Sequence, residues 1–286
     1  MTHRLLFVHA HPDDESLTCG IAMAHHVARG DEVHVLTCTL GEEGEVIPDS
    51  LRHLEAHPED ALGPHRHAEL AEAMRRLGVR LHVLGEGGER LSRYRDSGMA
   101  GSAAAARPEA FVRADVEEAA GLVASIVREI RPDVVVTYDP QGGYGHPDHI
   151  QTHRVTRAAL GLLDDAELPA RTFQIVTPAS WAREDRAWLR AHPQPGLTLL
   201  ADTDPYPPSV VPDVEVTHVV EDLAAWEAKN DALRAHATQV IVVSEEIHAL
   251  SNLIAARTAP REAFTQVDPL TWQRVERRGV GTALTD

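Results

Sequence analysis

The sequence predicts an α/β fold of the Rossmann-like, doubly wound type, with a mainly parallel central sheet and a smaller C-terminal region packed over its site. Short apolar runs typical of buried strands alternate with stretches whose apolar residues recur at helical spacing. The connections are short enough for right-handed strand–helix–strand crossovers, which place the strands parallel in one sheet. A chain of 286 residues that is 43% apolar can bury the large core this fold requires.

The first two crossover units are the clearest. Residues 5–10, 33–38 and 80–84 are apolar runs that predict strands, and the segments between them carry apolar residues at helical spacing. Gly30 and Gly78 directly follow these two helical segments, and glycine is common just past the C-terminal end of a helix. We therefore expect three strands joined by two helices.

The middle of the chain combines a long loop with a third unit. Residues 85–110 show weak periodicity, and an irregular segment of that length is usually functional or disordered. Residues 116–130 form a strongly amphipathic pattern that ends at Arg131-Pro132, because proline cannot continue a helix. The elements expected after it are a strand at residues 134–138, a helix over residues 147–159 and a strand at residues 173–176.

After about residue 180 the periodic signal weakens, because prolines interrupt the chain at short intervals. Residues 221–237 still predict a helix. We therefore expect an α/β core over residues 1–180 and a smaller α+β region over residues 181–286 that completes or covers the site. The sequence does not indicate an oligomeric state.

Composition and charge indicate which classes of partner and which cellular compartment to expect. Acidic residues outnumber basic ones by 44 to 27, and the formal charge of −17 repels polyphosphates and anionic lipid headgroups. We therefore expect no nucleic-acid partner and no membrane partner. Cys19 and Cys38 are too few for a disulfide framework, and no apolar stretch approaches the roughly 20 residues of a membrane helix. The first residues also lack a signal-peptide core, so a cytoplasmic location is expected.

Two short runs carry the chemistry. Residues 9–15 and residues 143–149 each group imidazoles and carboxylates around a proline, and each run directly follows a predicted strand. Ligands of open α/β sheets bind in the crevice outside the carboxyl ends of the strands. The two runs are therefore expected to meet at that edge and to form one metal site.

Three ligands for a hydrolytic metal can be drawn from these runs. Such an ion commonly binds three histidine or carboxylate side chains and lowers the pKa of a bound water towards about 7. His11, His149 and one of the two adjacent aspartates, Asp13 or Asp14, supply this set. Neighbouring side chains diverge, so the other aspartate is expected to face the water as general base. His153 is an alternative ligand. Zinc is the expected ion, and Fe²⁺ suits the same donors.

The second run also supplies groups that could act on an amide substrate. His146 precedes His149 by three positions, so both lie on one face of the first helical turn. An imidazolium at His146 could stabilise the tetrahedral oxyanion and protonate the departing amine. Asp148 is expected to orient that ring and to favour its charged form, and Tyr144 to donate a hydrogen bond to the oxyanion.

Several other functions lack their motifs. An oxidoreductase of the dinucleotide-binding type needs G-x-G-x-x-G, but the turn after the first strand contains no glycine. The Gly-Lys-Ser/Thr of P-loop enzymes and the G-x-S-x-G of serine hydrolases are also missing from the sequence.

Two alternatives remain open: the first run could be only a turn with a helix N-cap, and the protein could be a non-catalytic sugar-binding module.

The two runs resemble a known family. His11-Pro12-Asp13-Asp14-Glu15 together with His146-Pro147-Asp148-His149 resembles the LmbE-like, or PIG-L, superfamily of metal-dependent N-deacetylases that act on GlcNAc-containing substrates. Residues 37–46, 94–101 and 137–140 look like the mycothiol-pathway branch of that family. The likeness covers residues 4 to about 160 and, beyond them, residues 235–239. It implies hydrolysis of the acetamido group of N-acetylglucosaminyl-inositol, a small-molecule substrate, to acetate and the free amine.

The resemblance also implies a role for individual residues. It assigns the metal to His11, Asp14 and His149, the base to Asp13, the electrophilic histidine to His146, the tyrosine to Tyr144, and contacts with sugar or inositol hydroxyls to Arg66, Asp96 and Glu45. The main alternatives are the mycothiol S-conjugate amidase and another GlcNAc-type N-deacetylase. The amidase has a lysine after its first run, whereas Lys229 is the only lysine here and lies far along the chain.

Overall fold

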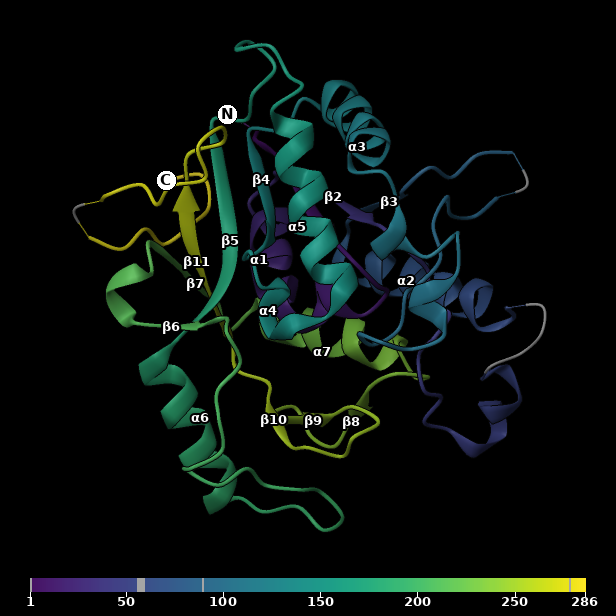
Figure 1. The fold of residues 1–286 in the computed structure, drawn as a ribbon. Helices are drawn as coiled ribbons and strands as arrows, with labels where there is room; N and C mark the ends of the chain where they lie inside the picture. The colour runs from purple at the N-terminus through teal and green to yellow at the C-terminus, as the bar shows by residue number, and fades with distance from the viewer. Residues whose placement is uncertain (1, 56–59, 89, 278) are drawn as a thin grey trace.

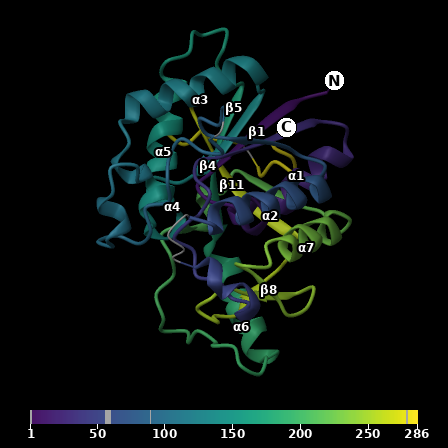
Figure 2. The same cartoon turned by 90° about the vertical axis from the view of Figure 1, so that its right-hand side faces the viewer.

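A computed structural model describes every residue except 1, 56–59, 89 and 278 (Figure 1). The described residues form a three-layer α/β fold in which helices cover both faces of a twisted central sheet (Figures 1 and 2). Seven of the eight strands lie in the order β3-β2-β1-β4-β5-β11-β7, and β6 pairs with β5. The predicted α/β fold with a mainly parallel sheet is confirmed.

The first five strands are parallel and follow the predicted apolar runs. They are β1 (Arg4–His9), β2 (Glu32–Thr37), β3 (Arg80–Val83), β4 (Val134–Tyr138) and β5 (Arg171–Pro178). The chain adds strands outward from β1 to β3 and then continues on the other side of β1 with β4, so the order reverses between β1 and β4. Such a reversal is where open α/β sheets bind ligands, outside the carboxyl ends of the strands.

Alternation along β1 explains why both faces of the sheet need helices. Leu5 and Phe7 point into one apolar core, whereas Leu6 and Val8 point into the other, and all four are fully buried. Helices α1, α2 and α7 close the first core, and α3 and α5 close the second (Figure 2). These helices are α1 (Asp14–Ala28), α2 (Leu62–Leu77), α3 (Val116–Ile130), α5 (Pro147–Leu160) and α7 (Ala225–Ala235).

The C-terminal part of the chain extends the main sheet. Two of its strands, β7 and β11, pair antiparallel beyond β5, and neither was predicted. Helix α6 was not predicted either. The division of the chain at residue 180 stays a prediction, while the sheet itself runs continuously across it. The bounds are α6 (Ala179–Ala191), β6 (Val210–Val211), β7 (His218–Glu221) and β11 (Arg261–Val267).

The helix predicted over residues 221–237 is shorter than expected. Glu221 still belongs to β7, and α7 begins only at Ala225. The carboxylate of Asp222 accepts hydrogen bonds from the backbone N–H groups of Ala224 and Ala225, which turns the chain between strand and helix. The predicted helix therefore began too early, because its first residues complete β7 and the turn that follows it.

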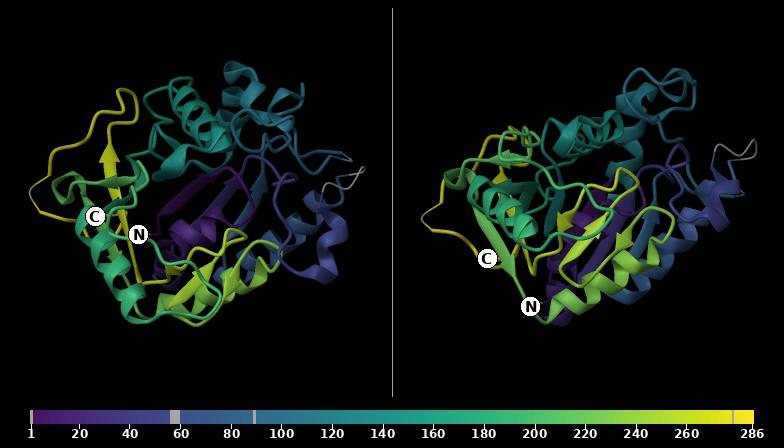
Figure 3. Two further views of the ribbon diagram at one scale, coloured as in Figure 1. Left: turned by 60° about the horizontal axis from the view of Figure 1, so that its bottom comes forward. Right: turned by 90° about the horizontal axis from the view of Figure 1, so that it is seen from below.

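A small antiparallel sheet of order β10-β9-β8 lies near α6 at the bottom of the view in Figure 1. Figure 3 turns this end towards the viewer. None of the described helices combines the length and the apolarity needed to cross a membrane. The remaining elements are 3₁₀ turns at Asp49–Leu54, Ala104–Ala106, Phe111–Arg113 and Asp213–Glu215, the short helix α4 (Gly142–Gly145), and β8 (Ile241–Val242), β9 (Ile247–Ala249) and β10 (Ala256–Arg257).

Candidate metal centre

The first run forms a strained turn between β1 and α1. The backbone of Asp13 has a φ of 121°, a region that side chains rarely adopt and that costs roughly 1–3 kcal/mol. Glu15 Oε2 accepts a hydrogen bond from the Asp13 N–H group at 3.0 Å, and Arg66 Nη2 donates to Asp13 Oδ2 at 3.1 Å. Arg66 also donates to the Pro12 carbonyl. Several contacts therefore maintain a conformation that is unfavourable by itself.

The second run forms a turn between β4 and α5. The Asp139 carboxylate accepts hydrogen bonds from the N–H groups of Gln141 at 2.6 Å and Gly143 at 3.2 Å. Gly142 has a φ of 64°, and a Cβ there would lie 2.6 Å from the backbone nitrogen of Ile150. Only glycine fits this close approach of the turn to the helix.

Helix α5 starts with a histidine cap. His146 Nδ1 accepts a hydrogen bond from the backbone N–H group of Asp148 at 3.2 Å, and Pro147 occupies the first helical position, where its missing N–H is not needed. His149 therefore lies in the first turn of the helix, as predicted, and its imidazole is buried.

Side chains from the two turns meet in one cluster. His11 Nδ1 lies 3.3 Å from His149 Nε2 and 3.6 Å from Asp14 Oδ2, and the last two atoms are 3.3 Å apart. Donors that bind one ion tetrahedrally at 2.0–2.1 Å lie roughly 3.3–3.4 Å from one another. These three residues, predicted as ligands from the sequence, thus present their donor atoms at the spacing that a single zinc-sized ion requires.

Two carboxylates lie behind His11. Asp148 Oδ2 is 3.1 Å and Asp96 Oδ1 is 3.5 Å from His11 Nε2, so that nitrogen faces an acceptor and leaves Nδ1 for the cluster. The sequence predicts that the Asp148 carboxylate orients His146, whereas in the structure this carboxylate contacts His11. Side chains two positions apart on a helix do not face each other, so the Asp148 carboxylate points to His11 while only its backbone contacts His146. A carboxylate that fixes a ligand histidine is common in metal sites.

His146 and Tyr144 lie beside this cluster. His11, His146 and His149 also offer ligand atoms within 4.8 Å of one another, and the three atoms of the set with Asp14 lie within 3.6 Å of one another. Burial, together with the two neighbouring histidine rings, lowers the pKa of His146 to about 3, so the imidazolium predicted from the sequence is not its resting form. Tyr144 is 56% exposed, and its ring centroid is 4.9 Å from that of His149.

The adjacent aspartates have pKa values shifted in opposite directions. Burial raises the pKa of Asp13 above its ordinary value, and the Arg66 guanidinium opposes only part of that shift. Burial acts in the same sense on Asp14, but the rings of His149 and His11 outweigh it and lower the pKa of Asp14. A carboxyl group with a raised pKa suits proton transfer, whereas one that stays ionised suits metal binding.

The three residues predicted to contact substrate differ in position. Arg66 and Asp96 are buried at the cluster, Arg66 against Asp13 and Asp96 against His11. Glu45 is exposed. The structure therefore brings two of these residues to the centre and leaves the third at the surface, and their contacts with substrate stay predictions.

Sequence reasoning did not single out Tyr138 and His236. The Tyr138 ring stacks on His149 with centroids 4.4 Å apart, and its hydroxyl lies 3.0 Å from the Ala10 N–H group. Tyr138 is the last residue of the strand before the second run, a position that could have marked it. His153, the alternative ligand, bonds the Tyr138 carbonyl at 2.9 Å. Among the described residues it belongs neither to the group of His11, His146 and His149 nor to the second metal-capable group, His11, Asp96 and Asp148.

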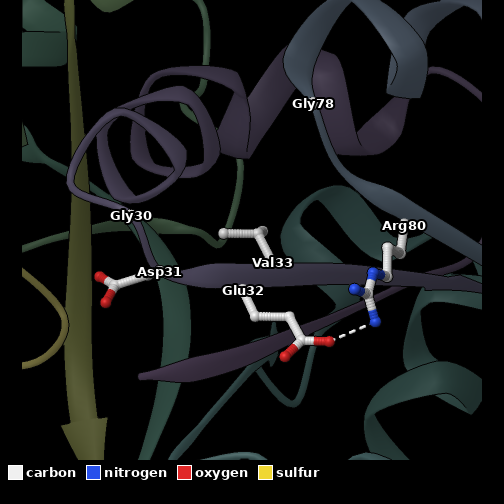
Figure 4. A pocket seen from close by; sticks show the side chains of 6 residues that line it. All are labelled: Gly30, Asp31, Glu32, Val33, Gly78 and Arg80. Carbon is white, nitrogen blue, oxygen red and sulfur yellow. Dashed lines mark hydrogen bonds and ion pairs between the residues drawn. The ribbon is translucent and has the colours of Figure 1, made fainter. Parts of the chain in front are cut away.

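A pocket of about 240 Å³ lies at the other end of the sheet (Figure 4). It is lined by residues just before and at the start of β2 and β3, the amino ends of those strands. Its charged groups already have partners: Glu32 pairs with Arg80, and Asp31 Oδ2 is 2.8 Å from His26 Nδ1. Nothing in its lining resembles the donor set at the carboxyl ends.

Residues 6–160 match the family model named PIG-L, GlcNAc-PI de-N-acetylase. The chain belongs to the PIG-L family. It is 48% identical over 276 residues to the 1D-myo-inositol 2-acetamido-2-deoxy-alpha-D-glucopyranoside deacetylase of Thermomonospora curvata, across 93% of this chain and 90% of that protein. The enzyme of the same name from Thermobifida fusca is 47% identical across 92% of each chain. The family predicted from the two runs is confirmed.

Solved structures of lower identity share the fold. The 4-carboxy-2-hydroxymuconate hydratase of Pseudomonas putida is 16% identical with a TM-score of 0.53, covering 98% of this PIG-L chain and 100% of its own. The zinc-inhibited form of teicoplanin deacetylase is 18% identical with a TM-score of 0.52, covering 93% and 99%. A hydratase and a deacetylase thus share one fold, so the reaction has to be argued from the residues of the site.

Proposed function

We propose that this protein removes the acetyl group from 1D-myo-inositol 2-acetamido-2-deoxy-α-D-glucopyranoside, giving acetate and the free amine, as a step of cytoplasmic mycothiol biosynthesis. The observation that carries the proposal is the cluster of three donor atoms from His11, Asp14 and His149 next to Asp13. Relatives of that name, 47–48% identical over at least 90% of both chains, support the substrate. The two cysteines are buried and free, as expected in a reducing compartment.

Zinc is the proposed ion, and His11, Asp14 and His149 would hold it. Two imidazoles and one carboxylate are a common catalytic zinc set that leaves a position for water. When bound, the ion would polarise the amide carbonyl and lower the pKa of water towards about 7. Fe²⁺ accepts the same donors. Reconstitution of metal-free protein with each ion tests the choice, and acetate release with iron but not with zinc would overturn it.

Asp13 is the proposed general base. In its ionised form it would take a proton from the attacking water, and its raised pKa makes it a stronger base than an ordinary aspartate. The Arg66 guanidinium beside its carboxylate maintains enough of the ionised form. The protonated Asp13 could then return this proton to the nitrogen of the departing amine, which the neutral resting state of His146 does not supply.

His146 and Tyr144 are the proposed donors to the developing oxyanion. Because Nδ1 of His146 accepts the Asp148 N–H bond, the neutral ring carries its proton on Nε2. A neutral imidazole donates a hydrogen bond to an oxyanion without the desolvation cost of a buried cation. Arg66 and Asp96 are proposed to meet the sugar next to the acetamide, and Glu45 to meet the outer inositol.

The main competing activity is cleavage of mycothiol S-conjugates at the amide of the same amino sugar. Lys229, the single lysine, lies against α1 just past the first run, but its Nζ is already bound there: it donates to Glu262 at 2.7 Å and to the Leu17 carbonyl at 2.9 Å, and both ionic side chains are buried. This arrangement favours the deacetylase. Acetate release from the proposed substrate should exceed cleavage of a bimane mycothiol conjugate, and the reverse order would reject the proposal. Asp13→Asn is the control for both reactions.

A further inference from the structure

The strained Asp13 turn is supported by two side chains, one from another helix and one from the first turn of α1. Arg66 contacts its carboxylate from α2, and the Glu15 carboxylate accepts its backbone N–H bond through Oε2. Because a φ of 121° is unfavourable for aspartate, this N–H bond is one of the contacts that determine where the carboxylate points. The position of Glu15 is therefore part of the geometry of Asp13.

Glu15 is in turn bound by a histidine from the C-terminal region. Its Oε1 accepts hydrogen bonds from Ser16 Oγ at 2.6 Å and from His236 Nε2 at 2.8 Å. All three side chains are fully buried, so water does not compete for these bonds. His236 directly follows α7. Its imidazole contacts Glu15 in the first turn of α1, which lies 221 positions earlier in the sequence.

The segment after His236 is anchored independently. Thr238 donates to the Glu69 carboxylate through its backbone N–H at 2.8 Å and its hydroxyl at 2.6 Å. Gln239 Nε2 donates to the Glu45 carbonyl at 3.2 Å. These contacts attach the end of α7 to α2 and to the loop after β2, so the imidazole of His236 projects from a fixed base.

We infer that His236 is a positioning residue for the reaction: through Glu15 it maintains the backbone of Asp13 in the conformation that aims the carboxylate at the attacking water. His236 does not touch the proposed donor set, so it acts on the base and not on metal binding. The role in catalysis rests on the proposed function, whereas the role in the Asp13 turn does not. In this way the C-terminal region contributes directly to the site.

Substitution of His236 by leucine and by glutamine tests the inference. Leucine removes the donor to Glu15 at similar volume, whereas Nε2 of glutamine can replace the histidine Nε2–H. We expect His236→Leu to lower kcat about 10- to 100-fold with KM and bound metal unchanged, the usual cost of losing such a supporting contact, and His236→Gln to restore most of it. His236→Asn, which is polar but too short to reach Glu15, replaces the leucine variant if that protein does not fold.

His248→Leu is the matched control. His248 is also a buried histidine of the C-terminal region, and its Nδ1 bonds Thr258 Oγ1 at 2.7 Å, away from Glu15. Its substitution is expected to lower the thermal midpoint without lowering kcat. If both leucine variants reduce kcat in proportion to their loss of stability, His236 is only structural and the inference is wrong.

Hydrogen exchange provides a measure that needs no activity. The Asp13 amide should exchange faster in His236→Leu than in the wild type and in His248→Leu, because its acceptor Glu15 loses its anchor. Unchanged exchange would overturn the inference. A wild-type protein that releases no acetate, with faster Asp13 exchange in His236→Leu, would reject the proposed function and leave the positioning role intact.

Discussion

The two turns that build the centre are supported in different ways. The turn after β4 is stabilised mainly by its own residues, since Asp139 bonds the next N–H groups and glycine supplies the unusual backbone angles. The turn after β1 contains no glycine, and Asp13 keeps its strained angle through Arg66 from α2 and through Glu15 in the first turn of α1, which is bound in turn by His236 at the end of α7. Strain that depends on distant contacts thus falls on the proposed base, whereas His149 follows from a locally encoded helix start.

Asp13→Asn should give the largest effect on turnover. Asparagine tolerates a positive φ, so the turn is expected to persist, but the amide cannot take a proton. We expect kcat to fall by about 10²- to 10⁴-fold while the metal content stays at the wild-type level. Acetate release and metal analysis on the same preparation measure both. Loss of the metal would instead assign Asp13 to the donor set.

Asp148→Asn should weaken metal binding by about 10- to 100-fold, because the neutral amide no longer supports His11 as the carboxylate does. Competition with a chelator measures the affinity. Unchanged metal affinity combined with a loss of turnover would instead support the role predicted from the sequence, in which Asp148 orients the His146 ring. Asp139→Asn, a carboxylate change in the turn before α5 whose carboxylate bonds the N–H groups of Gln141 and Gly143, is the control.

The pH dependence of kcat/KM sharpens the comparison at the first turn. The base acts when deprotonated, so activity should rise as the pH rises through the pKa of Asp13. An ordinary aspartate has a pKa of about 3.9. Because burial raises the pKa of Asp13, the acid limb of the profile should lie at a higher pH than that. Arg66→Gln removes the cation that opposes the shift and should move the limb to still higher pH. Movement to lower pH would contradict this account.

Asp139→Asn should have the smallest effect. The asparagine Oδ1 still accepts one of the two N–H bonds, and the glycine angles of the turn are unaffected. We expect a loss of stability of about 1 kcal/mol and only a few-fold decrease in kcat. Thermal unfolding and acetate release test this. A decrease as large as that of Asp13→Asn would show that the glycine angles and the remaining hydrogen bond do not maintain the second turn without the Asp139 carboxylate.

Most of the first half of the fold follows from the sequence pattern, and much of the second half does not. Helix α6 fully buries only Arg186 and Leu189, and Trp181 and Trp188 stay partly exposed, so it adds little to the apolar core. Strand β11 carries Glu262, which is buried and paired with Lys229 from α7, and this ion pair interrupts the apolar pattern. Such elements gain their stability from contacts that exist only after the chain has folded.

By itself, the sequence determined the parallel core, the ends of its helices, and the edge of the sheet at which the two runs with His11 and His149 meet, because these depend on residue patterns within a few positions and on where parallel strands end. Only the tertiary structure decided that Asp148 faces His11 and that His236 reaches Glu15. Those pairings depend on how helices pack across the sheet, and a linear pattern contains no signal for which distant side chains that packing brings within hydrogen-bond distance.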